Sequence, residues 1–251
     1  MSANNPMEQF AIRTLHPLSV SGYDVSFTNS ALWMLVALVV IAAFMVIGTM
    51  KPTLVPGRWQ AALEYVYDFV VGVVDENVGS KGKAYVPLIF SVFVFVLVCN
   101  LLGLVPWVGS FTPTSHIAVT LALALIVFLI VVIVGLVNHG LHFFTFFWPK
   151  GMHPALALFI MPIEVVSFLV RPFTLAIRLF ANMTAGHVLL KVFGTFVVAL
   201  GSFGALPYVF GIVPLAVNVA LSALELLIAL IQAYVFALLA SIYLNDAINL
   251  H

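Results

Sequence analysis

The sequence predicts an all-α integral membrane protein. Of its 251 residues, 64% are hydrophobic and only 7% are charged, whereas soluble domains carry about 25% charged residues. The mean hydropathy of +1.22 agrees with this class. Several apolar stretches reach the ~20 residues that a helix needs to cross the hydrocarbon core of a bilayer. We therefore expect a polar segment, residues 1–30, followed by one helical membrane domain, residues 31–251.

The polar segment carries Glu8, Arg13, His16 and Asp24. It lacks the apolar core and small-residue cleavage site of a secretory signal peptide. It also lacks the character of a transit peptide, so we expect a bacterial plasma (inner) membrane rather than a mitochondrial one.

Three stretches have the length and composition of near-perpendicular membrane spans. They are residues 31–50, 86–105 and 117–137. Between the first two, residues 59–78 place Glu64, Asp68 and Asp75 on one helical face and apolar side chains on the other. This pattern predicts an amphipathic helix along the membrane surface. Its polar face is acidic, which disfavours anionic lipid as its partner and leaves a protein neighbour as the alternative.

Two longer stretches follow, residues 155–192 and 208–245. A continuous helix of about 38 residues is roughly 57 Å long, nearly twice the ~30 Å of the hydrocarbon core. Each stretch therefore either breaks or lies at a steep tilt of roughly 60°, beyond the usual range. Pro162, Pro172 and Pro214 permit kinks but do not decide between these alternatives. Gly201, Gly204 and Pro207 mark the turn between the two stretches.

Lysine and arginine placement predicts the orientation. Basic residues gather in the connections after the first span, before the second and after the third, and the connection between the second and third spans has none. The residues concerned are Lys51, Arg58, Lys81, Lys83 and Lys150. The positive-inside rule puts these connections in the cytoplasm. With an odd number of crossings, the N-terminus is external and the C-terminus is cytoplasmic.

Polar side chains recur at seven-residue spacing in both long stretches, which places each set on one helical face. The first set comprises Glu164, Arg171 and Arg178, continued by Asn182, and the second comprises Asn218, Glu225 and Gln232. For the three amides, an inward seam that hydrogen-bonds across helices is the alternative to a functional path. Ionised groups are harder to explain as packing, because one at membrane depth costs about 2.5 to 3.5 kcal/mol.

The two arginines differ in their local surroundings. Arg171 precedes Pro172 and lies two turns from Glu164, so a structural salt bridge and a functional role are both open. Arg178 has no acidic residue three or four positions away. Its guanidinium does not release its proton, so it cannot carry protons itself. We expect its counter-ion to come from another helix or another chain.

Three side chains in these stretches can gain and release protons: Glu164, His187 and Glu225. His187 lies nine residues after Arg178, about half a turn round the helix, so the two side chains point to different faces. The alternative for His187 is a core histidine that Thr184 or Ser167 partners.

Other polar features indicate no cofactor. His139, His142 and His153 lie near no Asp, Glu or Cys that would complete a metal site, and the spacing of zinc proteases is absent. We expect no metal and assign them to an interfacial belt with the neighbouring aromatic residues. Cys99 is the only cysteine and is interpreted as a small core or lipid-facing residue. Nine basic and nine acidic residues cancel, so net charge says nothing about a nucleic-acid partner.

The segment RPFTLAIRLFANMTAGH, residues 171–187, closely resembles the signature of subunit a of F-type rotary ATP synthases. That signature is an arginine followed by Leu-Phe and then an asparagine, here Arg178, Leu179, Phe180 and Asn182. The resemblance extends to PIEVVSFLVRP, NLLGLVP, TPTSHIAVTLALAL and ELLIALIQAYVFALL, and so covers about the last 165 residues.

This resemblance implies a stator subunit with no nucleotide site of its own and no cofactor. It implies contact with a ring of c subunits that carry a membrane carboxylate, with peripheral-stalk b subunits and, through the stalk, with the F1 sector, but not with nucleic acid. Two aqueous half-channels would end at the ring, and the two long C-terminal helices would tilt steeply around it. Arg178 would face the ring carboxylate and separate the half-channels.

The resemblance also assigns roles to the other polar residues. Relay or channel positions map onto Glu164, Asn182, His187, Asn218, Glu225 and Gln232. Arg171, by contrast with Arg178, is expected to be a structural or supporting charge. Many bacterial members have a carboxylate where this chain has His187 and a histidine where it has Glu225. Because both chemical groups remain, we expect the relay to remain too.

Two other classes of function were weighed. A secondary transporter should carry two related halves or broken helices around a substrate site, and neither is visible. An intramembrane hydrolase needs a nucleophile with a base, and Ser167 and Ser222 have no convincing partner. No obvious cluster of oxygen ligands for Na⁺ is present, so we expect H⁺ as the transported ion.

Overall fold

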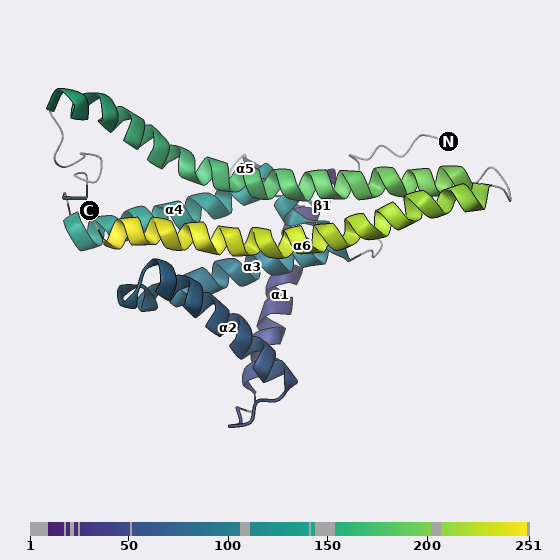
Figure 1. Ribbon diagram of the computed structural model, residues 1–251, viewed down its shortest axis with the longest axis horizontal. Helices are drawn as coiled ribbons and strands as arrows, with labels where there is room; N and C mark the ends of the chain where they lie inside the picture. The colour runs from purple at the N-terminus through teal and green to yellow at the C-terminus, as the bar shows by residue number, and fades with distance from the viewer. Residues whose placement is uncertain are drawn as a thin grey trace. The chain divides into compact units, whose positions relative to one another are not determined.

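The computed structural model describes residues 10–17, 19–20, 23–24, 26–50, 52–105, 111–140, 142–143, 154–201 and 207–249 (Figure 1). Within these ranges, five helical segments are long and apolar enough to cross a membrane. They are Asn29–Thr49, Ser80–Leu104, Ile117–His139, Phe159–Leu200 and Gly211–Ile248. These segments support the predicted class, a multi-pass helical membrane protein.

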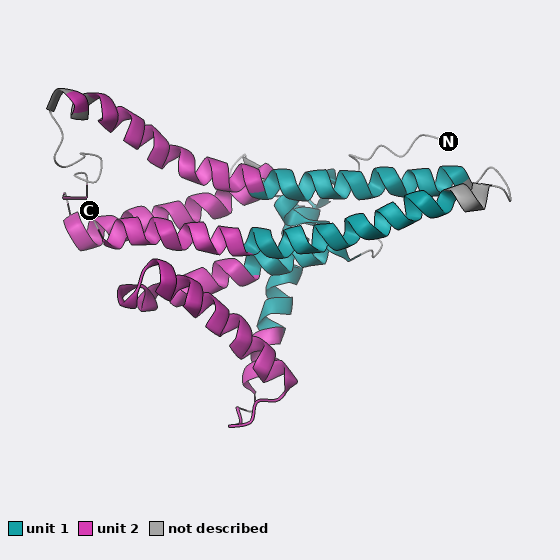
Figure 2. Cartoon of the chain, viewed as in Figure 1, with its two compact units in different colours: residues 1–43, 95–116, 179–233 teal, residues 44–94, 117–178, 234–251 magenta. Residues whose placement is uncertain are grey.

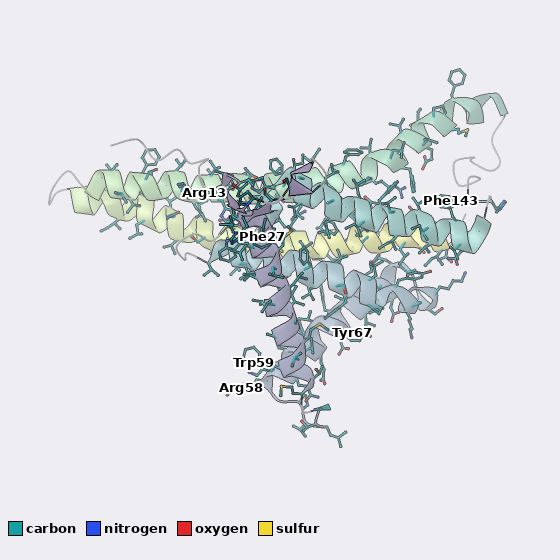
Figure 3. The ribbon with its side chains drawn as sticks, turned by 180° about the vertical axis from the view of Figure 1, so that it is seen from behind. Arg13, Phe27, Arg58, Trp59, Tyr67 and Phe143 are labelled. Carbon is teal, nitrogen blue, oxygen red and sulfur yellow. The ribbon has the colours of Figure 1, made fainter. Side chains whose placement is uncertain are left out.

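Short β-strands precede the first helix, α1 (Asn29–Thr49), and the prediction of a purely helical fold missed them. The antiparallel pairs are β1 (Thr14–His16) with β4 (Phe27–Thr28), and β2 (Ser19–Val20) with β3 (Tyr23–Asp24). Asn29 holds this segment to the start of α1, because its side chain donates to Ala11 O (3.0 Å) and accepts from Arg13 N (3.1 Å). Arg13 and Phe27 are labelled in Figure 3. Strands this short leave no alternating pattern in the sequence.

The predicted surface helix, residues 59–78, corresponds to α2 (Arg58–Asn77). Its apolar face buries Val70, Val73 and Val74, as the amphipathic pattern requires. At its C-terminal end the chain turns at Gly79, whose positive φ of 76° favours glycine. Aromatic pairs attach the helix to its neighbours in sequence, with ring centroids 6.5 Å apart for Trp59 and Phe44; Trp59 and Tyr67 are labelled in Figure 3.

The second and third predicted spans correspond to α3 and α4. A 3₁₀ turn, η2 (Ser80–Tyr85), leads into α3 (Val86–Leu104), and a second one, η3 (Pro113–Ser115), precedes α4 (Ile117–His139). The η3 turn is formed of buried residues, which is unusual for a connection and is important for the site described below.

The two long stretches correspond to α5 (Pro154–Gly201) and α6 (Pro207–Ile248). Both are continuous α-helices, with Pro162 and Pro172 inside α5 and Pro214 inside α6. The structure therefore contains neither of the helix breaks that the sequence left open. The steep tilt against the membrane stays a prediction. α5 also runs past residue 192, the predicted end, to residue 201, because its apolar sequence continues with no proline to stop it.

The chain divides into two compact units (Figure 2). Unit 1 comprises residues 1–43, 95–116 and 179–233, and unit 2 comprises residues 44–94, 117–178 and 234–251. Unit 1 buries Leu179 and Met183 of α5 together with Ala229 and Ala233 of α6. Small residues at four-residue spacing let helices approach closely. In unit 2, the core cluster comprises Val131, Phe143, Phe168 and Ala247; Phe143 is labelled in Figure 3.

Candidate functional site

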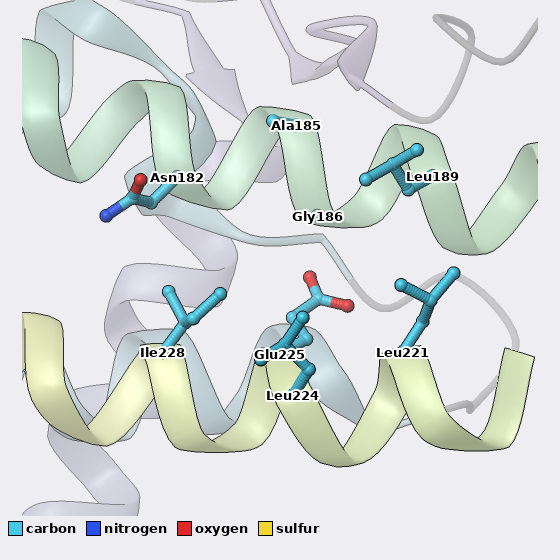
Figure 4. A pocket seen from close by; sticks show the side chains of 8 residues that line it. All are labelled: Asn182, Ala185, Gly186, Leu189, Leu221, Leu224, Glu225 and Ile228. Atoms are coloured by element: carbon cyan, nitrogen blue, oxygen red, sulfur yellow. The ribbon is translucent and has the colours of Figure 1, made fainter. Parts of the chain in front are cut away.

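Unit 1 contains a buried carboxyl group, that of Glu225 in α6. Only 3% of the residue is exposed, and its carboxylate extends toward α5 at Gly186 (Figure 4). Its Oε1 lies 3.4 Å from Nδ1 of His187. Neither carboxylate oxygen has a hydrogen-bond partner among the residues that the structure describes. A buried carboxylate without hydrogen bonds is costly, so water, a proton or a partner must satisfy it.

Gly186 is what allows Glu225 to come so close to α5. A Cβ atom added at this glycine would lie 2.6 Å from Oε1 and 2.9 Å from Cδ of Glu225. Any larger residue would therefore displace the carboxylate. The glycine precedes His187 in sequence, so one turn of α5 supplies both the space for the carboxyl group and its imidazole neighbour.

A pocket of about 140 Å³ opens between α5 and α6 beside this carboxylate (Figure 4). Its lining comprises Asn182, Ala185, Gly186, Leu189, Leu221, Leu224, Glu225 and Ile228. The lining is mainly aliphatic, with one carboxylate and one amide. A space this size can hold a few water molecules, and its two polar groups can bind them.

The other ring nitrogen of His187 is also in contact with a polar group. Its Nε2 lies 2.8 Å from Oγ1 of Thr112, a buried residue at the start of the segment 111–116 that contains η3. His187 therefore lies between a hydroxyl and a carboxylate. Because imidazole can take up a proton at one nitrogen and release one from the other, this arrangement can pass protons along a line.

The segment 111–116 is itself held by polar contacts inside unit 1. Thr114 Oγ1 donates to Asn100 Oδ1 (2.8 Å), and Asn100 Nδ2 donates to the carbonyl of Ala229 (3.4 Å). At the end of the segment, the His116 ring stacks on Phe111 at a centroid distance of 5.0 Å. Burial lowers the pKa of His116 below its ordinary value, and a hydrogen bond with the Phe10 backbone opposes this effect.

Some amide groups of unit 1 hydrogen-bond between helices, and others are buried without a partner among the described residues. Asn182 Nδ2 donates to Gln232 Oε1 over 2.9 Å, which joins α5 to α6 in the way the seam interpretation expects. However, Gln232 Nε2 and Asn218 Oδ1 are buried without a hydrogen-bond partner among the described residues. Such groups usually bind ordered water, so a water path along these amides remains compatible with the structure.

Arg171 forms an ion pair in unit 2, but its partner is Asp246 rather than Glu164, the neighbour considered from sequence. Arg171 Nη1 donates to Asp246 Oδ2 over 2.7 Å. The guanidinium carbon also lies 5.3 Å from the ring centroid of Phe168 and 4.9 Å from that of Tyr243. Carboxylate and cation–π contacts together compensate the charge.

Arg178 contrasts with Arg171. Its residue is exposed on α5, and within the described parts of the chain it makes no ion pair. Glu164 is half-buried in the same unit and likewise has no ion-pair partner there. Arg178 is thus an exposed cation on a helix of apolar composition.

The described residues contain no group of three or more His, Cys, Asp or Glu side chains that could hold a metal ion. His139 Nε2 instead lies 3.0 Å from the carbonyl of Ile248 at the end of α6. His153 lies outside the described residues. Cys99 is a free, buried thiol in unit 1.

Sequence reasoning missed four residues of these sites: Asn100, Thr112, Gly186 and Asp246. Asp246 had a detectable signal, because it is the only acidic residue after Glu225 and so a natural partner for a basic group. Gly186 could have been noticed as a small residue beside His187. Thr112 and Asn100 begin two of the segments that carry the resemblance, TPTSHIAVTLALAL and NLLGLVP. Nothing in the sequence indicated their contacts, because His187 lies 75 residues from Thr112 and Ala229 lies 129 residues from Asn100.

Comparison with known proteins gives a consistent result. The sequence profile of the ATP synthase A chain family matches residues 31–245. The chain is 50% identical to ATP synthase subunit a of Paramagnetospirillum magneticum, over 98% of this chain and 99% of that protein. It is 50% identical to the Rhodospirillum rubrum protein of the same name, over 99% and 100%, and 51% identical to that of Zymomonas mobilis, over the full length of both.

Proposed function

The chain belongs to the ATP synthase A chain family, and from this premise we propose that it is the proton-translocating stator subunit of an F-type ATP synthase. In this proposal it provides two aqueous half-channels and an arginine that faces the carboxylates of a c-subunit ring. It couples proton flow to ring rotation and thereby to ATP synthesis, which takes place elsewhere in the complex.

The observation that carries the proposal is the contact between Glu225 and His187. Both groups can gain and release a proton, they lie 3.4 Å apart, and Glu225 is buried without hydrogen bonds among the described residues. A group buried only for stability would normally have its hydrogen bonds satisfied. A carboxyl group that must accept and release protons benefits from an imidazole within reach and a water-sized space beside it.

The proposed path starts on the external side of the membrane. Protons enter toward Glu225 and His187, with Asn182, Asn218 and Gln232 binding water along the way and Glu164 contributing a further relay carboxyl. They then neutralise a ring carboxylate. A neutral carboxyl group can rotate into lipid at far lower free energy than a charged one.

Arg178 acts at the end of the cycle in this proposal. After nearly a full turn, the ring carboxyl group reaches the second half-channel, loses its proton toward the cytoplasm and passes the guanidinium. A fixed positive charge favours the ionised carboxylate there. It also repels protons, which keeps the two half-channels electrically separate. The exposure of Arg178 on α5 is what contact with a carboxylate of another chain requires.

We further propose the partners of the chain and its orientation in the membrane. Its partners are the c ring, the peripheral-stalk b subunits and, through the stalk, the F1 sector. The N-terminus lies on the external side and the C-terminus in the cytoplasm, with the two C-terminal helices steeply tilted. Arg171 is a supporting charge in this proposal.

The direct test is passive ion flux. The membrane sector, purified with the ring and without the catalytic head, is placed in liposomes and driven by a potassium diffusion potential, where each 100 mV is worth about 2.3 kcal/mol per charge. We expect acidification of the lumen in Na⁺-free buffer. Flux that requires Na⁺, or the absence of a co-purifying oligomer of a small hairpin protein, would contradict the proposal.

A further inference from the structure

Thr112 contacts His187 at the nitrogen that Glu225 does not face. The hydroxyl Oγ1 and ring Nε2 are 2.8 Å apart, while Nδ1 lies 3.4 Å from the Glu225 carboxylate. The imidazole is therefore held at both ends by residues from different segments of unit 1. Since a free imidazole can rotate about its side-chain bonds, the hydroxyl fixes which nitrogen faces the carboxylate.

The chemistry of a hydroxyl suits a histidine that changes its protonation state. A threonine hydroxyl can donate to a neutral nitrogen and, by rotating, accept from an N–H group. It therefore stays bonded to Nε2 whether the ring is neutral or charged. A carboxylate at the same place would instead favour the charged imidazolium ring, and an apolar side chain would leave Nε2 without a partner.

Thr112 itself is held firmly. It is only 5% exposed, and its carbonyl accepts two hydrogen bonds from Ser115, from N at 3.0 Å and from Oγ at 2.7 Å. Pro113 follows it and restricts its backbone to the extended region. The rest of the segment is tied to α3 through Thr114 and Asn100, and to α5 through Thr184, which donates to the Ser115 carbonyl at 3.4 Å.

The hydroxyl also depends on a glycine of α3. A Cβ atom added at Gly103 would overlap Thr112 Oγ1. Glycine at this position therefore leaves the space that the hydroxyl occupies beside His187, and a larger residue there would displace it. Backbone, glycine and hydrogen bonds all restrict the same side chain.

We propose that Thr112 is a positioning residue for the proton relay: it orients His187 toward Glu225 and stays hydrogen-bonded to it through both protonation states. This inference rests on the proposed function, in which His187 relays protons. It adds a residue of the segment before α4 to a path otherwise built from α5 and α6.

The test compares Thr112→Val with Thr112→Ser in the whole complex. Valine keeps the shape but removes the hydroxyl, whereas serine keeps the hydroxyl. Net hydrogen-bond energies correspond to about a three- to tenfold effect on rate, so we expect Thr112→Val to lower passive proton flux per assembled complex by that factor. Thr112→Ser should restore most of it. If the valine variant assembles poorly, Thr112→Ala replaces it.

A second readout detects orientation directly. With ¹⁵N-labelled histidine, and His187→Gln to identify the signal, NMR reports which His187 nitrogen carries the proton. We expect Thr112→Val to change this tautomer distribution and Thr112→Ser to leave it unchanged. Normal flux and an unchanged tautomer in Thr112→Val would overturn the inference, as would equal losses in the valine and serine variants.

The same experiment separates this inference from the proposed function. The variant His187→Gln, measured in parallel, should lower flux if His187 relays protons. A low flux in His187→Gln with normal flux in Thr112→Val would leave the relay in place and reject only the role of Thr112. Normal flux in both variants would reject the role of His187 itself.

Discussion

The ionisable pairs of the two units differ in how completely their charged groups are satisfied by contacts. In unit 2, Arg171 has a 2.7 Å contact with Asp246 and two aromatic rings around its guanidinium. In unit 1, His187 and Glu225 are 3.4 Å apart, and both oxygens of the carboxylate lack hydrogen bonds within the described chain. The Arg171–Asp246 pair is satisfied by contacts within the unit. The Glu225 carboxylate still needs water, a proton or a partner to satisfy its oxygens.

In the proposed function, this difference distinguishes a structural charge pair from a functional one. A charge pair that contributes only to folding is best served by complete hydrogen bonding, because unsatisfied buried groups cost free energy. A pair that exchanges protons cannot be locked into one state. The same logic separates the two arginines of α5, since Arg171 is paired within the chain and Arg178 is exposed.

The largest effect is expected from Arg178→Ala. We expect proton-driven ATP synthesis to fall to background, because the guanidinium faces the ring carboxylate in the proposed mechanism. The measurement is ATP synthesis by inverted membrane vesicles. Arg171→Lys, which keeps a positive charge, is the matched control and should retain substantial activity. Normal synthesis in Arg178→Ala would rule out its proposed role.

Glu225→Gln should have the next largest effect. The amide keeps the shape of the side chain but cannot exchange protons, and a positioned acid–base group typically contributes about 10²- to 10⁴-fold. Passive flux through complexes without the catalytic head measures it. Ser222→Ala, one turn away on an exposed part of α6, is the control. Unchanged flux would remove Glu225 from the path.

The ion pair of unit 2 should show a smaller effect, on stability rather than on flux. The two side chains are 20% and 22% exposed, so solvent screens them in part, and we expect a coupling energy of about 1 to 2 kcal/mol. A double-mutant cycle of Arg171→Met and Asp246→Asn, read as heat resistance of the detergent-solubilised complex, measures it. Strictly additive losses would show that the pair is not coupled.

The smallest expected effect concerns the amide seam. Asn182→Leu removes a hydrogen bond to Gln232, which should lower stability by about 0.5 to 1 kcal/mol. If the amides also bind water in the path, passive proton flux per assembled complex should fall as well. Flux that changes only in proportion to the amount of assembled complex would assign these amides to packing alone.

Helices were the part of the fold that the sequence predicted well. Apolar runs of about 20 residues and a seven-residue polar spacing depend on local periodicity. The helices α1 to α4 and α6 lie close to the expected ranges, whereas α5 ends at residue 201 rather than at the expected residue 192. The strands before α1 were missed because two or three residues give no period. The continuity of α5 could not be predicted either, because proline only permits a kink and packing decides whether one forms.

The sequence pointed to those residues of the candidate site that are unusual in a membrane helix. Glu225 and His187 stood out as ionisable groups in apolar sequence. Their contact could not be predicted, because it depends on how α5 and α6 pack in the tertiary structure. Thr112 and Asp246 are ordinary residues whose roles depend on partners 75 positions away in each case.

The separation of Arg171 from Asp246 has a consequence for biosynthesis. The aspartate is made 75 residues after the arginine, and at 5 to 20 residues per second this is a delay of about 4 to 15 seconds. Until Tyr243 is made shortly before Asp246, Phe168 is the only one of these three groups that the ribosome has already produced. The nascent α5 is therefore expected to stay at the translocon or near the lipid surface until α6 emerges, and the two helices should enter the bilayer as a pair.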